Sequence, residues 1–322
     1  TKAIQKQPIT GTSLGGFPAA YAETQAEYMA SGKATEQEKL VAGCPEYAFN
    51  EYLQIGLEQG LVGLALFIGW LGLLFYKGIK NKRYACCGGL MSLAIFAFSS
   101  YPLQLPEFWV VLIFLGVMSV TPDKDEIREN QAESNGHRWG KQIFFMGIAI
   151  LGIGLFWMQK DHYKAYQQWN KAQMFYNNKA YEAALEVYEP LYPLLKHKPE
   201  FLFEAAQSLS KTGQYEKANE YLERAVLLSS DPMLYYVMAK NEQCLGEYRQ
   251  AEKHLLHAID ILPERIYPYY LLMNLYTEPS YFQPAKLKMA IDSVLTKKPK
   301  VESSAIKEMK EKARSMLNNT SI

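Results

Sequence analysis

The stretch YEAALEVY at residues 181–188 returns as YEKANEYL at 215–222 and as YRQAEKHL at 248–255. Each copy begins with tyrosine and has alanine three residues later, and Phe282 and Ala285 continue the pattern. The alanines of the four units, which are 34, 33 and 34 residues apart, are Ala184, Ala218, Ala251 and Ala285. A fixed period of this length through four units indicates a repeat architecture.

The small residues at this period predict pairs of helices in close contact. Alanine lets two helix backbones approach, and the aromatic residue beside it can wedge between them. Further small residues at the same period are Ala172, Ala206, Ala239, Ala225 and Ala258, with Gly213 and Gly246 at the hairpin turns. The pattern resembles the tetratricopeptide repeat, which implies an open helical stack over residues 159–300. The fourth unit is degenerate, with Met273 and Asp292 at two small positions, and residues 301–322 are expected to form a capping helix and tail.

Four apolar blocks precede the repeats, at residues 55–76, 85–101, 105–120 and 143–158. A membrane-spanning helix needs roughly 20 residues, so the last three blocks are short, and buried helices of a soluble protein are the alternative. Four such blocks close together favour a transmembrane domain over 55–158. The fold class expected for the whole chain is therefore all-α, with polytopic transmembrane helices followed by a tetratricopeptide solenoid.

Basic residues set the expected orientation of these spans. Lys77, Lys80, Lys82 and Arg83 follow the first block, whereas the link at 102–106 has no basic residue. The third link again carries basic residues, namely Lys124, Arg128, Arg138 and Lys141. Because basic links stay in the cytoplasm, residues 1–54 and the repeats are expected on the outer side of the membrane.

Composition excludes several other classes of function. The net charge of +1 gives no field that would attract nucleic acid. The four cysteines show no C-x-x-C spacing, so no zinc or redox motif is expected. No signal peptide follows Thr1, and we expect Thr1 to be a cut edge within a longer protein.

The repeat register predicts a concave groove lined by the first helix of each pair. Stacks of this kind bind a peptide or another protein in such a groove. Aromatic rings that could grip a peptide or stack on a sugar are expected there, and packing between repeats is the alternative role for each ring. The groove residues predicted in this way are Tyr166, Trp169, Tyr176, Phe203, Tyr236, Tyr267 and Tyr270.

One segment carries a resemblance to an enzyme family. The stretch CPEYAFNEYLQIGLEQGLVGLALFIGWL at 44–71 contains Asn50, Glu51 and Leu53, followed by Glu58, Gly60 and Gly63. It resembles the signature of the O-antigen ligase and polymerase superfamily, in which His-Asn-Asp/Glu-x-Leu precedes an acidic residue, a glycine and a membrane helix. The glycine-rich run at 11–17 and the stretch SSYPLQLPEFW at 99–109 are similar to the flanking loop and turn of that family.

The resemblance implies transfer of a glycan from a polyprenyl-diphosphate carrier to lipid A-core or to a protein acceptor. It places the chain in the bacterial inner membrane as a multi-pass protein with a periplasmic repeat domain, and it implies no metal or other cofactor. A base is needed to deprotonate the acceptor hydroxyl. The histidine of the family falls at Phe49, which cannot take a proton, so Glu51 is the candidate base, with Asn50 and Glu58 beside it.

Other roles stay open for these residues and for the chain. Asn50 can be a helix N-cap, and the two glutamates can be interfacial anchors or favourable charges in a first helical turn. The arginines of the family would lie before Thr1, so this chain alone is expected to be inactive. The alternatives to a ligase are a non-enzymatic, membrane-anchored repeat scaffold and an enzyme of the polymerase type.

Overall fold

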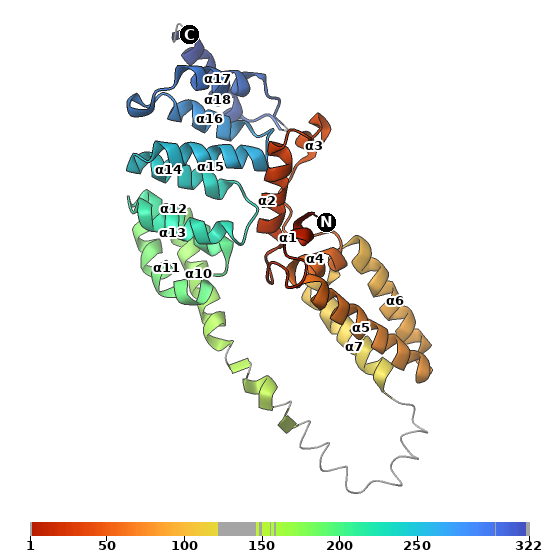
Figure 1. The fold of residues 1–322 in the computed structure, drawn as a ribbon. Helices are drawn as coiled ribbons and strands as arrows, with labels where there is room; N and C mark the ends of the chain where they lie inside the picture. The colour runs from red at the N-terminus through yellow and green to blue at the C-terminus, as the bar shows by residue number, and fades with distance from the viewer. Residues whose placement is uncertain are drawn as a thin grey trace, which may run out of the picture. The chain divides into compact units, whose positions relative to one another are not determined.

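The computed structural model describes residues 2–121, 146–147, 150–154, 156–157, 159–299 and 301–319. The described residues form helices and contain no strand, so the prediction of an all-α chain is confirmed for them. They fall into two compact units (Figure 1). The apolar unit comprises residues 1–17 and 47–164, and the repeat unit comprises residues 18–46 and 165–322.

The apolar unit is built around three apolar helices. Its elements are α1 Lys2–Lys6, α4 Glu51–Glu58, α5 Gly60–Lys80, α6 Tyr84–Ser99, the 3₁₀ turn η1 Pro102–Gln104 and α7 Pro106–Val120. Among the described residues, α5 alone is long and apolar enough to cross a membrane, and α6 and α7 are apolar but shorter. The fourth predicted block, 143–158, is described only in separate short pieces, and the rest of it lies outside the described residues. One described helix therefore has the length and composition of a membrane span, and membrane insertion with four spans stays a prediction.

A few leucines form the core of the apolar unit, whereas many other large apolar side chains of the unit are exposed. Leu90 and Leu112 are 1% and 2% exposed, and Leu71 packs with them. Gly78 permits close approach of α6, since a Cβ atom there would lie 2.6 Å from Cys87 Sγ. In contrast, Leu66 is 70% exposed on α5, and many large apolar residues of α6 and α7 are equally open.

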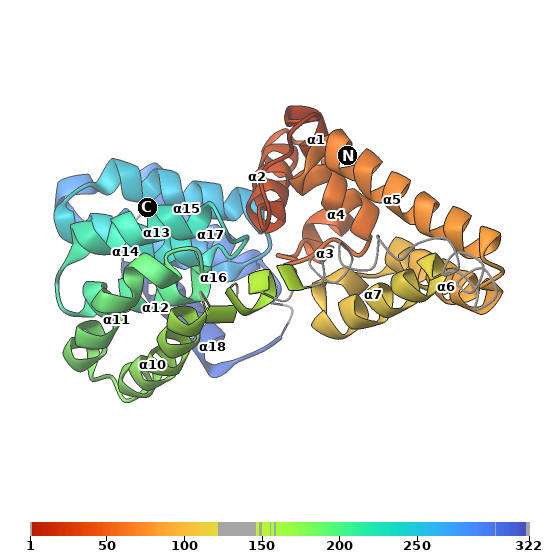
Figure 2. The ribbon, with the colours of Figure 1, turned by 90° about the horizontal axis from the view of Figure 1, so that it is seen from below.

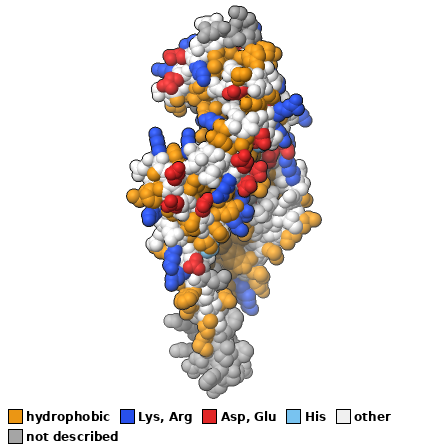
Figure 3. Space-filling model, turned by 90° about the vertical axis from the view of Figure 1, so that its left-hand side faces the viewer, with side chains coloured by type: hydrophobic (Ala, Val, Ile, Leu, Met, Phe, Trp, Pro, Cys, Tyr) orange, Lys and Arg blue, Asp and Glu red, His pale blue; other side chains and the backbone are white. Residues whose placement is uncertain are grey.

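The repeat unit is a stack of helical hairpins (Figures 1 and 2). Its elements are α2 Phe17–Ala30, α3 Glu36–Val41, α10 Lys160–Asn177, α11 Tyr181–Leu195, α12 Pro199–Lys211, α13 Tyr215–Val226, α14 Met233–Leu245, α15 Tyr248–Ile261, α16 Ile266–Leu275, the 3₁₀ turn η2 Pro279–Tyr281, α17 Pro284–Thr296 and α18 Ser304–Asn319. The hairpins pair α10 with α11, α12 with α13, α14 with α15 and α16 with α17. Acidic and basic side chains are interspersed over the part of this stack seen in Figure 3.

The predicted small residues lie inside the first three hairpins. Ala184, Ala218 and Ala251 are fully buried in the second helices. Ala172, Ala206 and Ala239 are at most 1% exposed in the first helices. A tetratricopeptide-like repeat domain is thus confirmed, because the period in the sequence coincides with the close contacts between helices.

The fourth hairpin departs from the predicted register by two residues. The second helices of the earlier hairpins begin at the tyrosine that leads each copy, but α17 begins at Pro284, two residues after Phe282. Phe282 is 52% exposed and Ala285 is also exposed, whereas Leu287 takes the buried position. The turn η2 lengthens the hairpin and shifts the buried face, which corrects the assignment of Phe282 and Ala285 as packing residues.

A segment far away in the sequence completes the repeat unit. Ala22, Ala26 and Ala42, from α2 and the end of α3, form a core cluster with Ile261 and Leu262. Gln25 Nε2 donates to the carbonyl oxygens of Ile261, at 2.8 Å, and of Gly43, at 3.1 Å. Figures 1 and 2 both show α2 beside the end of α15. The sequence predicts a single extracytoplasmic loop over residues 1–54, and in the structure residues 18–46 of this stretch belong to the repeat unit.

Candidate functional site

The first helices carry a ladder of polar side chains at the repeat period. Each member of the ladder directly follows the buried residue at the small position of its helix. The members are Gln173 after Ala172, Gln207 after Ala206, Lys240 after Ala239, and Asn274 after Met273, which replaces the small residue in the fourth repeat. Helical geometry therefore places them at equivalent positions on successive first helices. Sequence reasoning missed this set, although its spacing is the spacing of the alanines and could have revealed it.

Glu204 on α12 accepts several hydrogen bonds at the end of the ladder that begins on α10. Trp169 Nε1 donates to Glu204 Oε2 at 2.7 Å, and Gln173 Nε2 donates to Glu204 Oε1 at 2.8 Å. The buried Tyr188 also donates its hydroxyl to Oε2, at 3.0 Å. Hydrogen bonds to an ionised carboxylate are stronger than neutral ones, so Glu204 joins three helices firmly. Burial and this carboxylate together raise the pKa of Tyr188.

Four predicted groove aromatics lie at this end of the stack. Tyr166 is 38% exposed, and its ring centroid is 5.9 Å from that of Trp169. The hydroxyl of Tyr176 donates to Gln207, and Phe203 is half-buried against the core cluster. These rings are partly accessible and partly used in packing between repeats.

The other end of the ladder is cationic and aromatic. Lys240 Nζ donates to the Tyr267 hydroxyl at 2.7 Å and lies 5.4 Å from the centroid of that ring. The Tyr267 and Tyr270 rings stack with centroids 6.5 Å apart. On α18, Lys312 Nζ lies 5.3 Å from the Tyr270 centroid and donates to Asn274 Oδ1 at 2.9 Å. Both ammonium groups therefore lie at the hydroxyl ends of these tyrosines, since Lys312 Nζ is also 3.4 Å from the Tyr270 hydroxyl.

Tyr236 differs from the other predicted groove residues. It is 4% exposed, and its hydroxyl oxygen is buried without a hydrogen-bond partner. Its ring meets the Tyr267 ring edge-on, with centroids 5.3 Å apart. Burial raises the pKa of Tyr236, so the phenol stays neutral. Tyr236 therefore packs between repeats and presents no face to a ligand in this structure.

In the apolar unit, Glu51 is enclosed. It is 1% exposed, and its carboxylate accepts hydrogen bonds from Leu103 N at 2.7 Å and Gln104 Nε2 at 3.2 Å. Burial raises the pKa of Glu51, although these hydrogen bonds act in the opposite direction. Glu51 thus ties the start of α4 to the turn η1.

Asn50 and Glu58 also have structural partners. Asn50 is the N-cap of α4, since its Oδ1 accepts from Leu53 N at 2.9 Å, and its Nδ2 donates to Phe98 O at 2.8 Å. Glu58 is 8% exposed and accepts from Gln54 Nε2 at 3.3 Å. Phe49, at the position of the family histidine, is 68% exposed, and its ring meets that of Tyr101 edge-on.

The glycine-rich run contacts the junction of α4 and α5. Thr12 N and Ser13 N donate to the carbonyl oxygens of Leu57 and Glu58, at 2.9 and 3.0 Å. A Cβ atom on Gly60, which has a φ of +71°, would lie 2.0 Å from Ile9 O, so only glycine fits there. The three segments quoted above, at 11–17, 44–71 and 99–109, therefore share one network of hydrogen bonds around α4.

No metal centre is evident in the parts of the chain that the structure describes. Within those residues, no group of three or more His, Cys, Asp or Glu side chains is placed to hold a metal ion.

Comparisons with known proteins concern the repeat unit. The family model described as "Anaphase-promoting complex, cyclosome, subunit 3" matches residues 177–258. The crystal structure of MamA protein is 17% identical with a TM-score of 0.39, over 48% of this chain and 88% of that chain. A putative kinesin light chain from Podospora anserina, with nearly identical TPR-like repeats, is 17% identical with a TM-score of 0.38, over 49% and 88%.

A further similar structure was solved with a peptide. The Yersinia enterocolitica type III secretion chaperone SycD, in complex with a peptide of the translocator YopD, is 16% identical with a TM-score of 0.30, over 47% of this chain and 92% of that chain. No curated protein matches the sequence.

Proposed function

We propose that this chain is a membrane-anchored scaffold whose repeat unit binds an extended segment of a partner protein along its first helices. The observation that carries the proposal is the ladder of Gln173, Gln207, Lys240 and Asn274 at one position per repeat. An extended peptide presents backbone donors and acceptors at regular intervals, and a regular row of polar side chains is complementary to it.

The ladder keeps hydrogen-bonding capacity for such a peptide. A glutamine or asparagine side chain has two N–H donors and an acceptor oxygen. Gln207 accepts from Tyr176, and Asn274 accepts from Lys312, so each bond uses only the carbonyl oxygen of its amide. The Trp169 and Tyr270 rings beside the ladder add apolar contact area for a peptide.

The membrane part of the proposal rests on the apolar unit. Its helix α5 has the length and composition of a span, and it leaves Leu66 and Leu73 63–70% exposed. In water such a surface would drive aggregation, whereas lipid would cover it. We therefore propose a multi-pass protein of the bacterial inner membrane, with four spans within residues 55–158 and a periplasmic repeat unit.

Photo-crosslinking in the full chain tests the peptide groove. The photoreactive residue p-benzoylphenylalanine would replace Phe203, on the first-helix side, or Leu256, which is 44% exposed on the second helix α15. The chain, held in detergent micelles, would be challenged with a library of random twelve-residue peptides displayed on phage. We expect peptides selected by the chain to crosslink from position 203 and not from 256. Equal labelling from both positions, or no selected peptide, would contradict the proposal.

A second candidate function is the glycan ligase that the sequence resembles. The specific observation in its favour is that the 11–17, 44–71 and 99–109 segments share one hydrogen-bond network around Glu51 and Gly60. In this proposal the acceptor hydroxyl loses its proton and forms a bond to the sugar, and the polyprenyl diphosphate leaves. Lipid A-core or a protein would be the acceptor, and Glu51, assisted by Asn50 and Glu58, would take the proton.

The two functions separate in a glycan-transfer assay on the membrane-embedded protein. Glu51→Gln should cause carrier-linked glycan to accumulate if Glu51 takes the proton, and the exposed Glu107→Gln serves as the matched control. Hydrogen exchange at Leu103 reports on the structural role of Glu51. Accumulation with unchanged exchange supports the ligase. Full transfer by Glu51→Gln overturns Glu51 as the base.

A further inference from the structure

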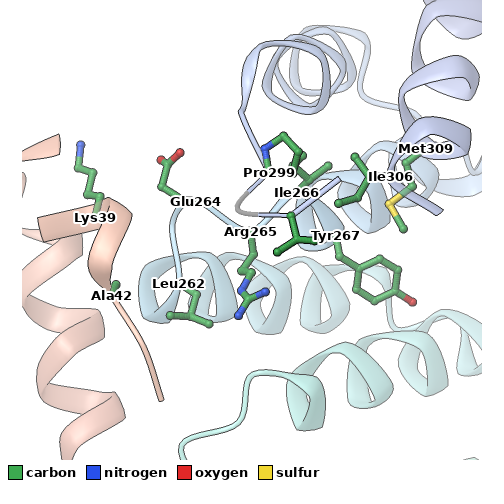
Figure 4. Close-up of a pocket in the computed structure, with 11 residues that line it drawn as sticks. Lys39, Ala42, Leu262, Glu264, Arg265, Ile266, Tyr267, Pro299, Ile306 and Met309 are labelled. Carbon is green, nitrogen blue, oxygen red and sulfur yellow. The ribbon is translucent and has the colours of Figure 1, made fainter. Parts of the chain in front are cut away.

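A cavity in the repeat unit lies where three distant segments converge. It has a volume of about 190 Å³ and is lined by the end of α3, by the connection from α15 to α16 and by the residues before and within α18. In Figure 4, Pro299, Ile306 and Met309 lie on one side of the cavity, and Arg265 and Tyr267 lie on the other. Leu262 and Ile266 add to an apolar wall.

The size of the cavity suits one apolar side chain. An apolar cavity of about 150 Å³ holds a benzene molecule. A volume of about 190 Å³ therefore accommodates a leucine or phenylalanine side chain, but not several residues of a chain. The apolar wall makes burial of such a side chain favourable, because its apolar surface is removed from water.

Arg265 leaves an uncompensated positive charge beside this apolar space. The other two charged residues of the lining are paired, Lys39 Nζ with Glu36 at 2.7 Å and Glu264 with Lys297 at 2.7 Å. Arg265 forms no ion pair with any residue that the structure describes, and its guanidinium carries five N–H donors. The charge of the site is thus complementary to an anion.

Tyr267 connects the cavity to the polar ladder. Its ring lines the cavity, and its hydroxyl accepts a hydrogen bond from Lys240 at 2.7 Å. Because the Tyr267 oxygen already accepts from Lys240, its proton is available to a further acceptor. The Arg265 guanidinium and the Lys240 ammonium, which reaches the lining through the Tyr267 hydroxyl, are therefore two separate sources of positive charge beside the apolar space.

We infer that this site, which we name the anchor site, reads one apolar residue next to a carboxylate in the partner peptide. The apolar side chain enters the cavity between Ile266 and Ile306, and the carboxylate of a neighbouring aspartate or glutamate meets Arg265, while Lys240 adds positive charge at the Tyr267 hydroxyl. The inference rests on the proposed peptide-binding function and adds sequence specificity to it. Peptides of other composition would still contact the ladder, but more weakly.

Selection from the same phage library tests the inference. The full chain in detergent would be compared with the double variant Arg265→Gln, Lys240→Gln and with Lys253→Gln, a control on the second helix α15. We expect the native chain and the control to enrich peptides with leucine or phenylalanine beside an acidic residue. The double variant should lose this enrichment, because charge-assisted hydrogen bonds to the carboxylate are absent.

Synthetic peptides quantify the preference. Four fluorescein-labelled octapeptides of glycine and serine would carry central Phe-Glu, Phe-Gln, Ser-Glu or Phe-Lys. Fluorescence anisotropy should show the Phe-Glu peptide bound about tenfold more tightly than the others. Ile306→Phe, which fills the cavity, should remove the advantage of phenylalanine over serine. Met289→Phe, at a position 70% exposed outside the cavity, should leave that advantage intact.

The outcomes separate this inference from the function on which it rests. Enriched peptides without an acidic or apolar preference, retained by the double variant, would overturn the anchor site and leave peptide binding standing. No enriched peptide with any variant would overturn both. Displacement of the Phe-Glu peptide by dextran sulfate, with all four peptides bound equally, would assign the cations to an anionic glycan and overturn the inference.

Discussion

Helices α5 and α13 show two opposite ways to distribute apolar side chains. On α5, Leu66 is 70% exposed and the helix buries few of its leucines. On α13, Leu222 is fully buried, and the charged residues Glu223 and Arg224 are exposed. Both helices have neighbours in their own unit, but α13 buries its apolar face against them and α5 leaves most of its apolar face open. The open face of α5 is the observation on which the proposed lipid environment rests.

The same substitution in the two helices should give the largest contrast. Leu222→Ala removes a fully buried side chain and should lower the free energy of unfolding of the repeat unit by about 3 kcal/mol. Leu66→Ala removes an exposed side chain and should change the stability of the apolar unit in detergent by less than about 0.5 kcal/mol. Hydrogen exchange followed by mass spectrometry reports each unit separately. Similar losses at both positions would contradict the comparison.

A smaller effect is expected at the backbone junction of the apolar unit. Gly60→Ala introduces a Cβ atom 2.0 Å from Ile9 O at a φ of +71°, and should cost about 2 kcal/mol in local stability. Gly72→Ala is the matched control, because nothing lies within 4 Å of a Cβ there. Thermal unfolding of the two variants would measure the difference. If Gly60→Ala lowered the unfolding temperature no more than Gly72→Ala does, the proposed tight contact at the junction would be refuted.

The enclosed carboxylate of Glu51 should make the apolar unit sensitive to pH. Burial raises the pKa of Glu51 above its ordinary value of 4.5 in the folded state. The folded state therefore binds the proton more tightly than the unfolded state, and stability falls as the pH rises from the unfolded pKa through the folded one. Glu51→Gln should remove this decline in a series of thermal unfolding measurements.

The exposed Glu107→Gln provides the control for that series. Its carboxylate lies on the surface in the first turn of α7, so the decline with pH should persist in this variant. A decline of the same size in Glu51→Gln would assign the pH dependence to another group.

The smallest effect is expected at a charge pair on the surface of the repeat unit. Lys217 Nζ lies 2.5 Å from Glu189 Oε1, and both side chains are more than 40% exposed. Such pairs contribute little in water, so Lys217→Gln should cost about 0.3 kcal/mol. High salt should reduce even this difference in denaturant unfolding experiments. A loss comparable to that of Leu222→Ala would mean that the stability of the stack does not come mainly from its apolar core.

The period of the alanines was sufficient to predict the first three hairpins. It failed in the fourth because η2, around Pro279, changes the length of the turn, and turn length is not part of the periodic signal. The aromatic register placed Trp169, Phe203, Tyr236 and Tyr270 at equivalent positions. Whether a ring is buried depends on its neighbour on the next helix, as the contact of Tyr236 with Tyr267 shows, and one helix alone does not reveal it.

Sequence reasoning also reached only part of the two sites. It identified Asn50 and Glu51 as a pair of interest and named helix capping as an alternative role for Asn50. It could not predict that the backbone N–H of Leu103 donates to the Glu51 carboxylate, because this hydrogen bond joins residues 52 positions apart. The docking of α2 onto α15 was missed for the same reason, because it too joins residues far apart in the sequence. The alanine-rich sequence of α2 gives no sign of which distant surface it covers.

The contact between Gln25 and Ile261 spans 236 residues of sequence, which has a consequence for biosynthesis. A ribosome adds roughly 5–20 residues per second, so α2 waits on the order of ten to fifty seconds before its docking surface exists. During that interval Ala22 and Ala26 have no helix to cover them. The docking of α2 onto α15 is thus a late step in folding. Chaperones that bind nascent chains have the longest time to act on α2 before this step.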